Sequence, residues 1–200
     1  VDQWDWELVI GPEDRTLAFL ESIVRRIYEA LLETEERVCA AFPVLEKRLP
    51  RTITFVHAQT LEDRYPALDP RAREDRAAGE HGAVFVVGIG ARLRSGVPHD
   101  VRAADYDDWT SVDGNSLPGL NGDIILWNAT LGRAFELSSM GIRVDPPALE
   151  RQLAIRGMDS RKGLPFHRRL LAGELPLSIG GGLGQSRLCM YLLRKAHIGE

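Results

Sequence analysis

Hydrophobic and polar positions alternate at the beginning of the chain with the two-residue period of a β-strand. In VDQWDWELVI (residues 1–10), the apolar side carries Trp4, Trp6 and Leu8. The polar side carries Gln3, Asp5 and Glu7. Because successive side chains of a strand point to opposite faces, the pattern predicts a strand with one solvent-facing, polar side.

The period changes to that of a helix after Gly11. Pro12 followed by Glu13 and Asp14 is typical of a helix start. Apolar residues then recur at helical spacing, at Leu17, Leu20, Val24, Ile27, Leu31 and Val38. Pro43 cannot continue a helix. The pattern predicts one long amphipathic helix between Pro12 and Pro43.

Further strands and helices alternate along the rest of the chain. The predicted strands are 52–57, the continuous apolar run 82–90, and the pair 123–128 and 133–140, which a short turn joins into a hairpin. The predicted helices are a polar stretch after residue 57 that Pro66 and Pro70 interrupt, then 146–156, 166–174 and 183–195. A loop is expected at 110–120.

This order of elements favours an α+β fold with a mostly antiparallel sheet flanked by helices. A doubly wound parallel sheet is the competing interpretation. It is weakened because the glycine-rich segment 180–184 lies near the end of the chain, whereas a dinucleotide-binding fingerprint opens the first βαβ unit of such folds. We expect residues 1–200 to form a single domain.

Composition narrows the function classes. Of 200 residues, 44% are hydrophobic and the net charge is −4, with acids and bases interspersed. This hydrophobic content is sufficient for a buried core. The charge pattern lacks the basic face that duplex nucleic acid requires, so no nucleic-acid partner is expected. No stretch is long and apolar enough for a membrane span. Cys39 and Cys189 fall in helical patterns, which predicts buried free thiols and a cytoplasmic location.

In the segment LSIGGGLGQSRLCM (177–190), four glycines without side chains are followed by Arg187 and the start of a predicted helix. Glycines at such a position allow a ligand to approach the backbone closely. The segment is neither a Walker A sequence nor a dinucleotide fingerprint. The structural alternative is a flexible glycine loop before a helix.

Three polar clusters are candidates for chemistry. The first is the polar side of the opening strand, and the second is HDVRAADYDDW (99–109), where four aspartates surround Arg102. The third contains Asp123 and Glu136 on adjacent strands of the hairpin, a pair of carboxylates that could bind Mg²⁺ together with phosphate oxygens. The structural alternatives are a solvated face, weak surface ion pairs and cross-strand pairing.

Two motifs resemble those of class II aminoacyl-tRNA synthetases. FELSSMGIRVD (135–145) is similar to the aspartyl- and asparaginyl-tRNA synthetase pattern of a metal-binding Glu followed seven residues later by an Arg. GGGLGQSR (180–187) is similar to their motif 3, G-x-G-x-G-x-x-R. Blocks along the whole chain, among them VDQWDWE, HDVRAADYDDW and IGGGLGQSRL, resemble the ammonia-dependent asparagine synthetase A family of aspartate–ammonia ligases.

The resemblance implies a class II synthetase-like catalytic core that works as a homodimer. It also implies a reaction in which ATP converts the side-chain carboxylate of L-aspartate to a β-aspartyl-adenylate, with release of diphosphate. Ammonia then displaces AMP to give L-asparagine. Mg²⁺ is the implied metal ion.

The resemblance also assigns roles to individual residues. Asp123 and Glu136 are expected to hold Mg²⁺, on the same face of the sheet as Gln3. Arg187 is expected over the mouth of the pocket, on the adenine that lies above Gly182 and Gly184. The substrate side is expected to contain Gln3 for the reacting carboxylate and Asp5 for the substrate ammonium. Asp107 is expected to meet the same ammonium or the incoming ammonia, Ser139 the substrate or the ribose, and Arg143 an aspartate carboxylate.

The family has a further segment before VDQWDWE and a short tail after HIGE. We therefore expect this chain to be a piece of a longer protein, with the motif 2 arginine upstream of it. Two alternatives remain: the core of a class II aminoacyl-tRNA synthetase, and a non-catalytic module that binds nucleotide or a partner subunit. The first lacks support because neither an anticodon-binding domain nor a basic surface is visible in the sequence.

Overall fold

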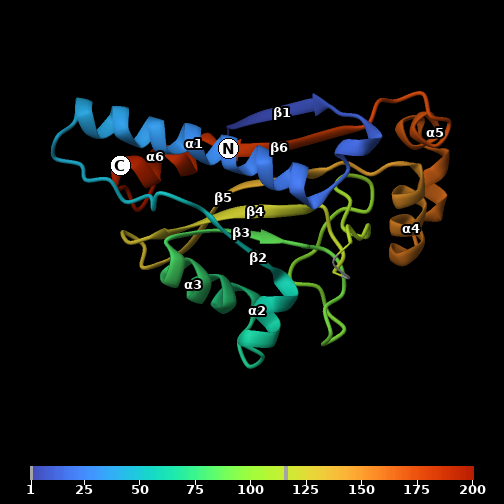
Figure 1. Cartoon of the computed structure of the whole chain (residues 1–200), viewed down its shortest axis with the longest axis horizontal. Coiled ribbons are helices and arrows are strands. Elements are labelled where there is room, and N and C mark those ends of the chain that lie inside the picture. Colours follow the sequence, from blue (N-terminus) through green and yellow to red (C-terminus); the bar gives the residue numbers. More distant parts are fainter. Residues whose placement is uncertain (1, 115–116) are drawn as a thin grey trace.

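The computed structural model describes residues 2–114 and 117–200. In these residues, strands form one six-stranded sheet in the order β1-β6-β5-β4-β3-β2 (Figure 1). Every neighbouring pair is antiparallel except β2 and β3. The strands are β1 (Gln3–Val9), β2 (Thr54–His57), β3 (Ala83–Val87), β4 (Asn121–Asn128), β5 (Arg133–Ile142) and β6 (Ser178–Gly184). The α+β prediction is therefore confirmed, and the parallel alternative is wrong.

Helices cover the sheet unequally (Figure 1). The helices are α1 (Leu17–Ala41), α2 (Ala58–Arg64), α3 (Pro70–His81), α4 (Pro146–Arg156), α5 (Pro165–Leu171) and α6 (Gln185–Leu193), with short 3-10 helices η1 (Pro12–Asp14) and η2 (Asp159–Gly163). Buried side chains of α1 and α6 form one core with one face of the sheet. Those of α2 and α3 form a second core against β3 and β4 on the other face, and α4 and α5 pack together at the end of the sheet.

The site depends on this unequal cover. The second face is packed under α2 and α3 in its β3–β4 half, whereas no α2 or α3 side chain packs over β1 and β6 in the described cores. Gln3, Asp5 and Glu7 stand on that open part. The opposite side of β1 faces α1, where Trp6 packs against the core, while Trp4 and Leu8 remain 50% and 44% exposed.

Two local predictions need correction. The glycines 180–184 form part of strand β6, not a loop, because β6 lies between β1 and β5 and pairs with both. The final helix accordingly begins at Gln185 rather than at residue 183. The loop expected at 110–120 includes residues 115 and 116, which lie outside the described residues.

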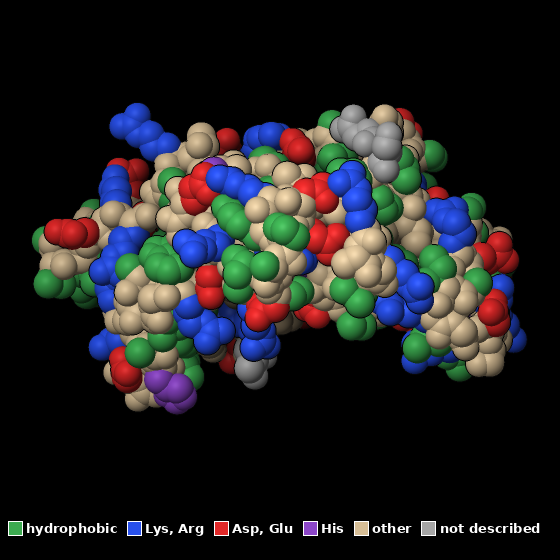
Figure 2. All heavy atoms as spheres, turned by 90° about the horizontal axis from the view of Figure 1, so that it is seen from below, with side chains coloured by type: hydrophobic (Ala, Val, Ile, Leu, Met, Phe, Trp, Pro, Cys, Tyr) green, Lys and Arg blue, Asp and Glu red, His purple; other side chains and the backbone are tan. Residues whose placement is uncertain are grey.

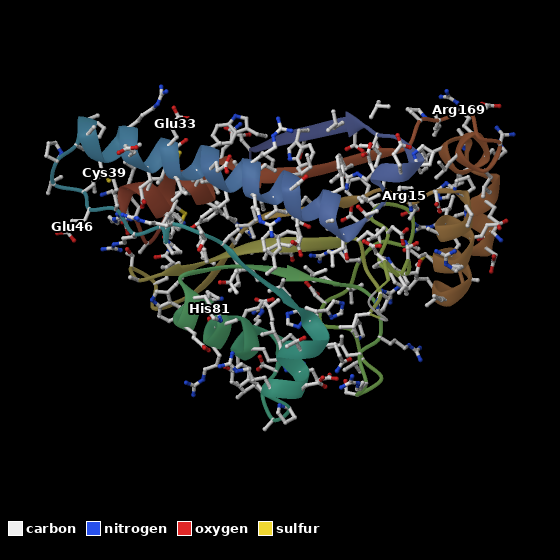
Figure 3. All side chains as sticks on the ribbon, in the orientation of Figure 1. Arg15, Glu33, Cys39, Glu46, His81 and Arg169 are labelled. Carbon is white, nitrogen blue, oxygen red and sulfur yellow. The ribbon has the colours of Figure 1, made fainter. Side chains whose placement is uncertain are left out.

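The cysteine prediction is also only half right. Both thiols are free, but Cys189 is exposed and Cys39, labelled on α1 in Figure 3, is half-buried. Leu188 and Leu192 supply the buried face of α6, so the side chain of Cys189 turns away from the core. None of the helices in the described ranges is long and apolar enough to cross a membrane.

Candidate active site

The open face of the sheet is organised in rungs of paired residues. One rung runs Asp5–Gly182–Ser139–Asp123 across β1, β6, β5 and β4. Paired residues of neighbouring strands project to the same face. The register thus places Asp123 on the face that carries the polar side of β1.

The neighbouring rungs repeat this arrangement. Gln3 pairs with Gly184 on one side, and Glu7 pairs with Gly180 on the other. Each polar side chain of β1 therefore stands beside a glycine of β6. A Cβ atom at Gly182 would lie 2.7 Å from Oδ1 of Asp5, so the glycines leave the sheet surface low beside these side chains.

A β-bulge between β4 and β5 brings Glu136 and Ser139 to the same face. Asp123 pairs with Ser139, whereas Ile125 pairs with Glu136, so one residue of β5 is extra between these pairs. The odd spacing of 136 and 139 would otherwise place their side chains on opposite faces. Glu136 and Asp123 therefore project to the same face from adjacent antiparallel strands, and the charge of Glu136 raises the pKa of Asp123.

A cavity of about 700 Å³ lies over this face. It has the size of a small-molecule site. Eight of the ten predicted site residues line it, namely Gln3, Asp5, Asp107, Glu136, Ser139, Gly182, Gly184 and Arg187. Asp123 is buried beside Glu136 and contacts the cavity residue Arg102, and Arg143 lies behind Tyr106.

Asp123 is a buried carboxyl group with one oxygen left unpaired among the described residues. Burial raises its pKa to about 6, the positive charge of Arg102 opposes that rise, and the negative charge of Glu136 adds to it. Its Oδ2 accepts a hydrogen bond from Arg102, while its buried Oδ1 has no hydrogen-bond partner among the described residues. An unpaired buried carboxylate oxygen is unfavourable unless something binds it.

This donor set fits Mg²⁺ only in part. Asp123 and Glu136 offer two carboxylates, and Mg²⁺ commonly takes one or two protein carboxylates with waters and phosphate oxygens. Within residues 2–114 and 117–200, no cluster of three or more His, Cys, Asp or Glu side chains is arranged to hold a metal ion. A bound Mg²⁺ would therefore need oxygens from nucleotide or water to complete its coordination.

Arg187 is placed as expected at the edge of the cavity. It is the third residue of α6, and its side chain is 45% exposed. Its Nη1 donates to the carbonyl oxygen of Glu136 at 2.8 Å and lies 3.3 Å from Oε1 of that residue. Arg187 therefore pairs with a half-exposed acid, Glu136, whereas the surface acid Glu174 pairs with Arg169 of α5 (Figure 3).

Arg143 is enclosed by partners and does not line the cavity. Its Nε and Nη2 each donate to Glu7 at 2.9 Å, and its Nη1 donates to Asp107. The guanidinium also stacks on Tyr106, 3.8 Å from the ring centroid. The expected grip on an aspartate carboxylate therefore requires Glu7 or Asp107 to give up a hydrogen bond.

The carboxylates around Arg143 differ in their pKa values. Burial raises the pKa of Glu7, but hydrogen bonds from Arg143 and Ser178 outweigh burial and hold that pKa below its ordinary value. At the more deeply buried Asp107, burial dominates and raises the pKa, although Arg143 opposes it. Glu7 is consequently the more strongly ionised partner of Arg143.

Sequence reasoning missed three contributors to the site: Glu7 as a partner of Arg143, Tyr106 as the side chain that covers it, and Arg102 as the partner of Asp123. The cluster 99–109 stands out by its composition, but no spacing rule selects Arg102 or Tyr106 from it. Their positions depend on how this irregular segment lies against the end of β5, where Asp107 forms an isolated bridge with Arg143.

Charges of both signs are mixed on the molecular surface seen from below, where Lys and Arg side chains are interspersed with Asp and Glu (Figure 2). At the sheet end near the start of α1, Arg15 lies among side chains (Figure 3) and pairs with Asp108 at 2.6 Å and with Asp145 at 3.1 Å. The buried pair with Asp108 ties the end of segment 99–109 to Arg15, just ahead of α1, and the pair with Asp145 reaches the N-cap of α4.

Comparison with solved structures shows the fold. An asparaginyl-tRNA synthetase from Pyrococcus horikoshii complexed with asparaginyl-adenylate superposes with a TM-score of 0.67 at 16% identity, over 98% of this chain and 45% of the other. An aspartyl-tRNA synthetase from Entamoeba histolytica gives 0.66 at 14% identity, over 97% of this chain and 40% of the other. The fold is therefore that of a class II aminoacyl-tRNA synthetase core.

Comparison of sequences shows the family. The family model described as aspartate-ammonia ligase matches residues 1–200. Relatives named aspartate--ammonia ligase, from Parabacteroides distasonis and Bacteroides thetaiotaomicron, are each 54% identical over 200 residues, which is 100% of this chain and 58% of their own length. The chain thus spans somewhat more than half of these relatives, and it belongs to the aspartate–ammonia ligase family.

Proposed function

We propose that this chain carries the metal and adenine side of an enzyme that makes L-asparagine from L-aspartate, ammonia and ATP. The single observation that carries the proposal is the rung Asp5–Gly182–Ser139–Asp123, which places a glycine floor between polar side chains of β1 and the carboxylates of the hairpin. Family membership makes the ligase reaction the first to test.

The reaction has two group-transfer steps. An oxygen of the aspartate side-chain carboxylate forms a bond to the α-phosphorus of ATP, and diphosphate leaves. The ammonia nitrogen then forms a bond to the acyl carbon, AMP leaves, and the nitrogen loses a proton. Because a carboxylate and a triphosphate are both anions, positioning and neutralisation of charge supply most of the catalysis in the first step.

The nucleotide side consists of β6 and α6. Gly182 and Gly184 form the floor that the adenine approaches, and the planar guanidinium of Arg187 stacks on the base or meets phosphate charge. Asp123 and Glu136 would hold Mg²⁺, which supplies positive charge at the phosphate oxygens when bound.

The amino-acid side consists of β1, β5 and segment 99–109. Gln3 orients the reacting carboxylate by hydrogen bonds, and Ser139 bonds the substrate or the ribose. Asp5 attracts the substrate ammonium, Asp107 attracts that ammonium or the incoming ammonia, and Arg143 binds a carboxylate of aspartate. Most of these residues line the cavity, which supports the roles. Substitution of each residue tests its role.

The test is a product assay, run on this chain and on a chimera that adds the part of the Parabacteroides relative that the chain does not cover. We expect AMP formation that requires both aspartate and ammonia and no tRNA. Aspartate-dependent transfer to tRNA would instead indicate a class II aminoacyl-tRNA synthetase. ATP binding by both proteins without AMP formation would indicate a non-catalytic nucleotide-binding module.

Assembly and location complete the proposal. Family membership supports a homodimer in the cytoplasm, and the mixed surface charge gives no support for a nucleic-acid partner. Analytical ultracentrifugation of the chimera is expected to give twice the protomer mass. A monomer at micromolar concentration would contradict the homodimer.

A further inference from the structure

Each of the two carboxylates assigned to the metal is bound by an arginine. Arg102 donates through Nη2 to Asp123, and Arg187 lies with its Nη1 3.3 Å from Oε1 of Glu136. The two arginines come from different elements that border the cavity, one from segment 99–109 and the other from α6. The ion pairs occupy the same carboxylates that a divalent cation would use.

Acidic side chains outnumber basic ones in the cavity lining. Among the described lining residues, the acids are Asp2, Asp5, Asp107 and Glu136, and the bases are Arg102 and Arg187. Phosphate groups that enter this cavity meet an excess of like charge, and such repulsion is strong in a partly buried site. A triphosphate therefore needs cations that are free to bind it rather than cations already neutralised by carboxylates.

Arg102 has few other attachments that would hold its guanidinium in place. Its Nη1 lies 3.5 Å from the exposed carboxylate of Asp100 and 3.4 Å from the carbonyl oxygen of Val101. Its buried Nε has no hydrogen-bond partner among the described residues. Residues 99–105 form neither helix nor strand, so the pair with Asp123 is the main contact that keeps Arg102 in its observed direction.

We propose that Arg102 is a phosphate-binding arginine that rests on Asp123 in the free protein and is exchanged there for a divalent cation when nucleotide binds. The inference rests on the proposed function for the identity of the nucleotide. One divalent cation carries the same charge as the two guanidiniums that leave Asp123 and Glu136. The exchange keeps the carboxylates neutralised and frees Arg102 and Arg187 for the phosphates, where bidentate hydrogen bonds are strong.

The exchange predicts opposite effects of one substitution on two ligands. Arg102→Met removes the competitor of the cation, so the affinity for Mn²⁺ without nucleotide is expected to rise about tenfold, as for loss of one competing charge-assisted contact. The same substitution removes a phosphate contact, so ATP affinity at saturating Mn²⁺ is expected to fall by about tenfold. Electron paramagnetic resonance measures free Mn²⁺, and calorimetry measures ATP binding.

The matched control is Arg94→Met. Arg94 lies in the same region of the chain, but its side chain is 71% exposed and pairs with Asp63 at the surface. Neither affinity is expected to change in this variant. Arg102→Lys is the second test variant because it keeps a charge beside buried Asp123 and so protects folding. It is expected to leave Mn²⁺ affinity close to that of the unsubstituted chain but to weaken ATP binding, since an ammonium lacks the planar fork.

Two results would overturn the inference. Mn²⁺ affinity that falls or stays constant in folded Arg102→Met shows that Arg102 does not compete for Asp123. ATP affinity that is unchanged in both Arg102 variants shows that Arg102 does not bind phosphate. Failure of the proposed function has a different signature: the unsubstituted chain and the chimera bind Mn²⁺ but no ATP. In that case the Mn²⁺ affinity of Arg102→Met still tests whether Arg102 competes with the cation for Asp123.

Discussion

Two adjacent glycines of β6 serve opposite faces of the sheet. A Cβ atom at Gly181 would lie 2.5 Å from Cβ of Met140 and 2.7 Å from the backbone oxygen of Ser139, on the packed side. The atoms nearest to a Cβ atom at Gly182 would be the ends of the exposed side chains of Asp5 and Gln3. Close packing explains the first glycine, and access for a ligand explains the second.

This contrast predicts a separation of stability from binding. Gly181→Ala is expected to lower the free energy of unfolding by about 1–3 kcal/mol, because the core has no room for a methyl group. Gly182→Ala is expected to change stability by less than that and to weaken ATP binding, because the methyl group raises the floor of the cavity. Urea unfolding and calorimetry measure the two effects. Equal losses of stability would contradict the assignment of faces.

Arg143 is the residue whose geometry is hardest to replace. It joins Glu7, Asp107 and Tyr106 through different edges of one planar group. A lysine keeps the charge but has no fork with which to bind two carboxylates at fixed angles. The arrangement therefore depends on the guanidinium shape as well as on its charge.

We expect Arg143→Lys in the chimera to raise the KM for aspartate and to lower kcat, with ATP binding unchanged. The reason is that a point charge cannot hold Asp107 and a substrate carboxylate in place together. Steady-state kinetics at saturating ATP and ammonia checks the result. Arg169→Lys, at an exposed pair with Glu174, is the control and should leave the kinetics unchanged. Unaltered aspartate kinetics in Arg143→Lys would rule out a direct contact.

At the scale of elements, short helix α2 begins with an unusual cap. Nδ1 of His57 accepts a hydrogen bond from the backbone of Gln59 at 3.0 Å. Nε2 lies 3.0 Å from the carbonyl oxygen of Pro118, so this nitrogen carries the proton and donates. The cap therefore requires the neutral ring, because a protonated Nδ1 cannot accept.

The cap predicts a loss of stability in mild acid. Burial lowers the pKa of His57 below its ordinary value of 6.5, although the bond to Pro118 opposes this. Below pH 6.5 the unfolded chain binds a proton that the folded chain resists, so stability falls as the pH decreases. His57→Asn keeps a capping side chain without this titration and is expected to flatten the decline between pH 7 and about 5. Urea unfolding across that range checks it, and parallel curves for both proteins would contradict it.

At the scale of the whole molecule, one sheet separates two cores. Phe85 of β3 is fully buried in the core under α1 and stacks edge-to-face on Phe55, with centroids 5.7 Å apart. The next residue, Val86, is fully buried in the core under α2 and α3. Because both cores share the same strand, neither can lose its packing without disturbing the other.

Phe85→Ala is accordingly expected to destabilise the entire fold by about 3–5 kcal/mol. Amide hydrogen exchange should accelerate in α3 as much as in α1, although α3 lies on the face opposite to Phe85. Phe166→Ala, at a side chain that is 48% exposed, serves as the control and should change little. Faster exchange in α1 alone would show that the two cores unfold independently.

The sequence by itself determined most of the elements and the class of fold, and it predicted eight residues that line the cavity, but it did not reveal strand β6. Local periodicity marked β1, α1 and the hairpin, because side-chain alternation follows directly from strand and helix geometry. The pair Asp123 and Glu136 was recognisable because a hairpin connects them through a short turn. Arg187 was recognisable because residues 180–187 resemble motif 3, in which spacing along the chain identifies the arginine.

Only the tertiary structure decided which distant segments meet. The first and last strands, β1 and β6, are neighbours in the sheet, and this pairing alone sets the glycines beside Gln3 and Asp5. Hydrophobic periodicity also does not predict the bulge that turns Ser139 to the face of Glu136. Nor does it predict the ion pair between Arg102 and Asp123. Such contacts depend on long-range pairing and on the path of irregular segments, and both are fixed by packing of the whole chain rather than by local sequence period.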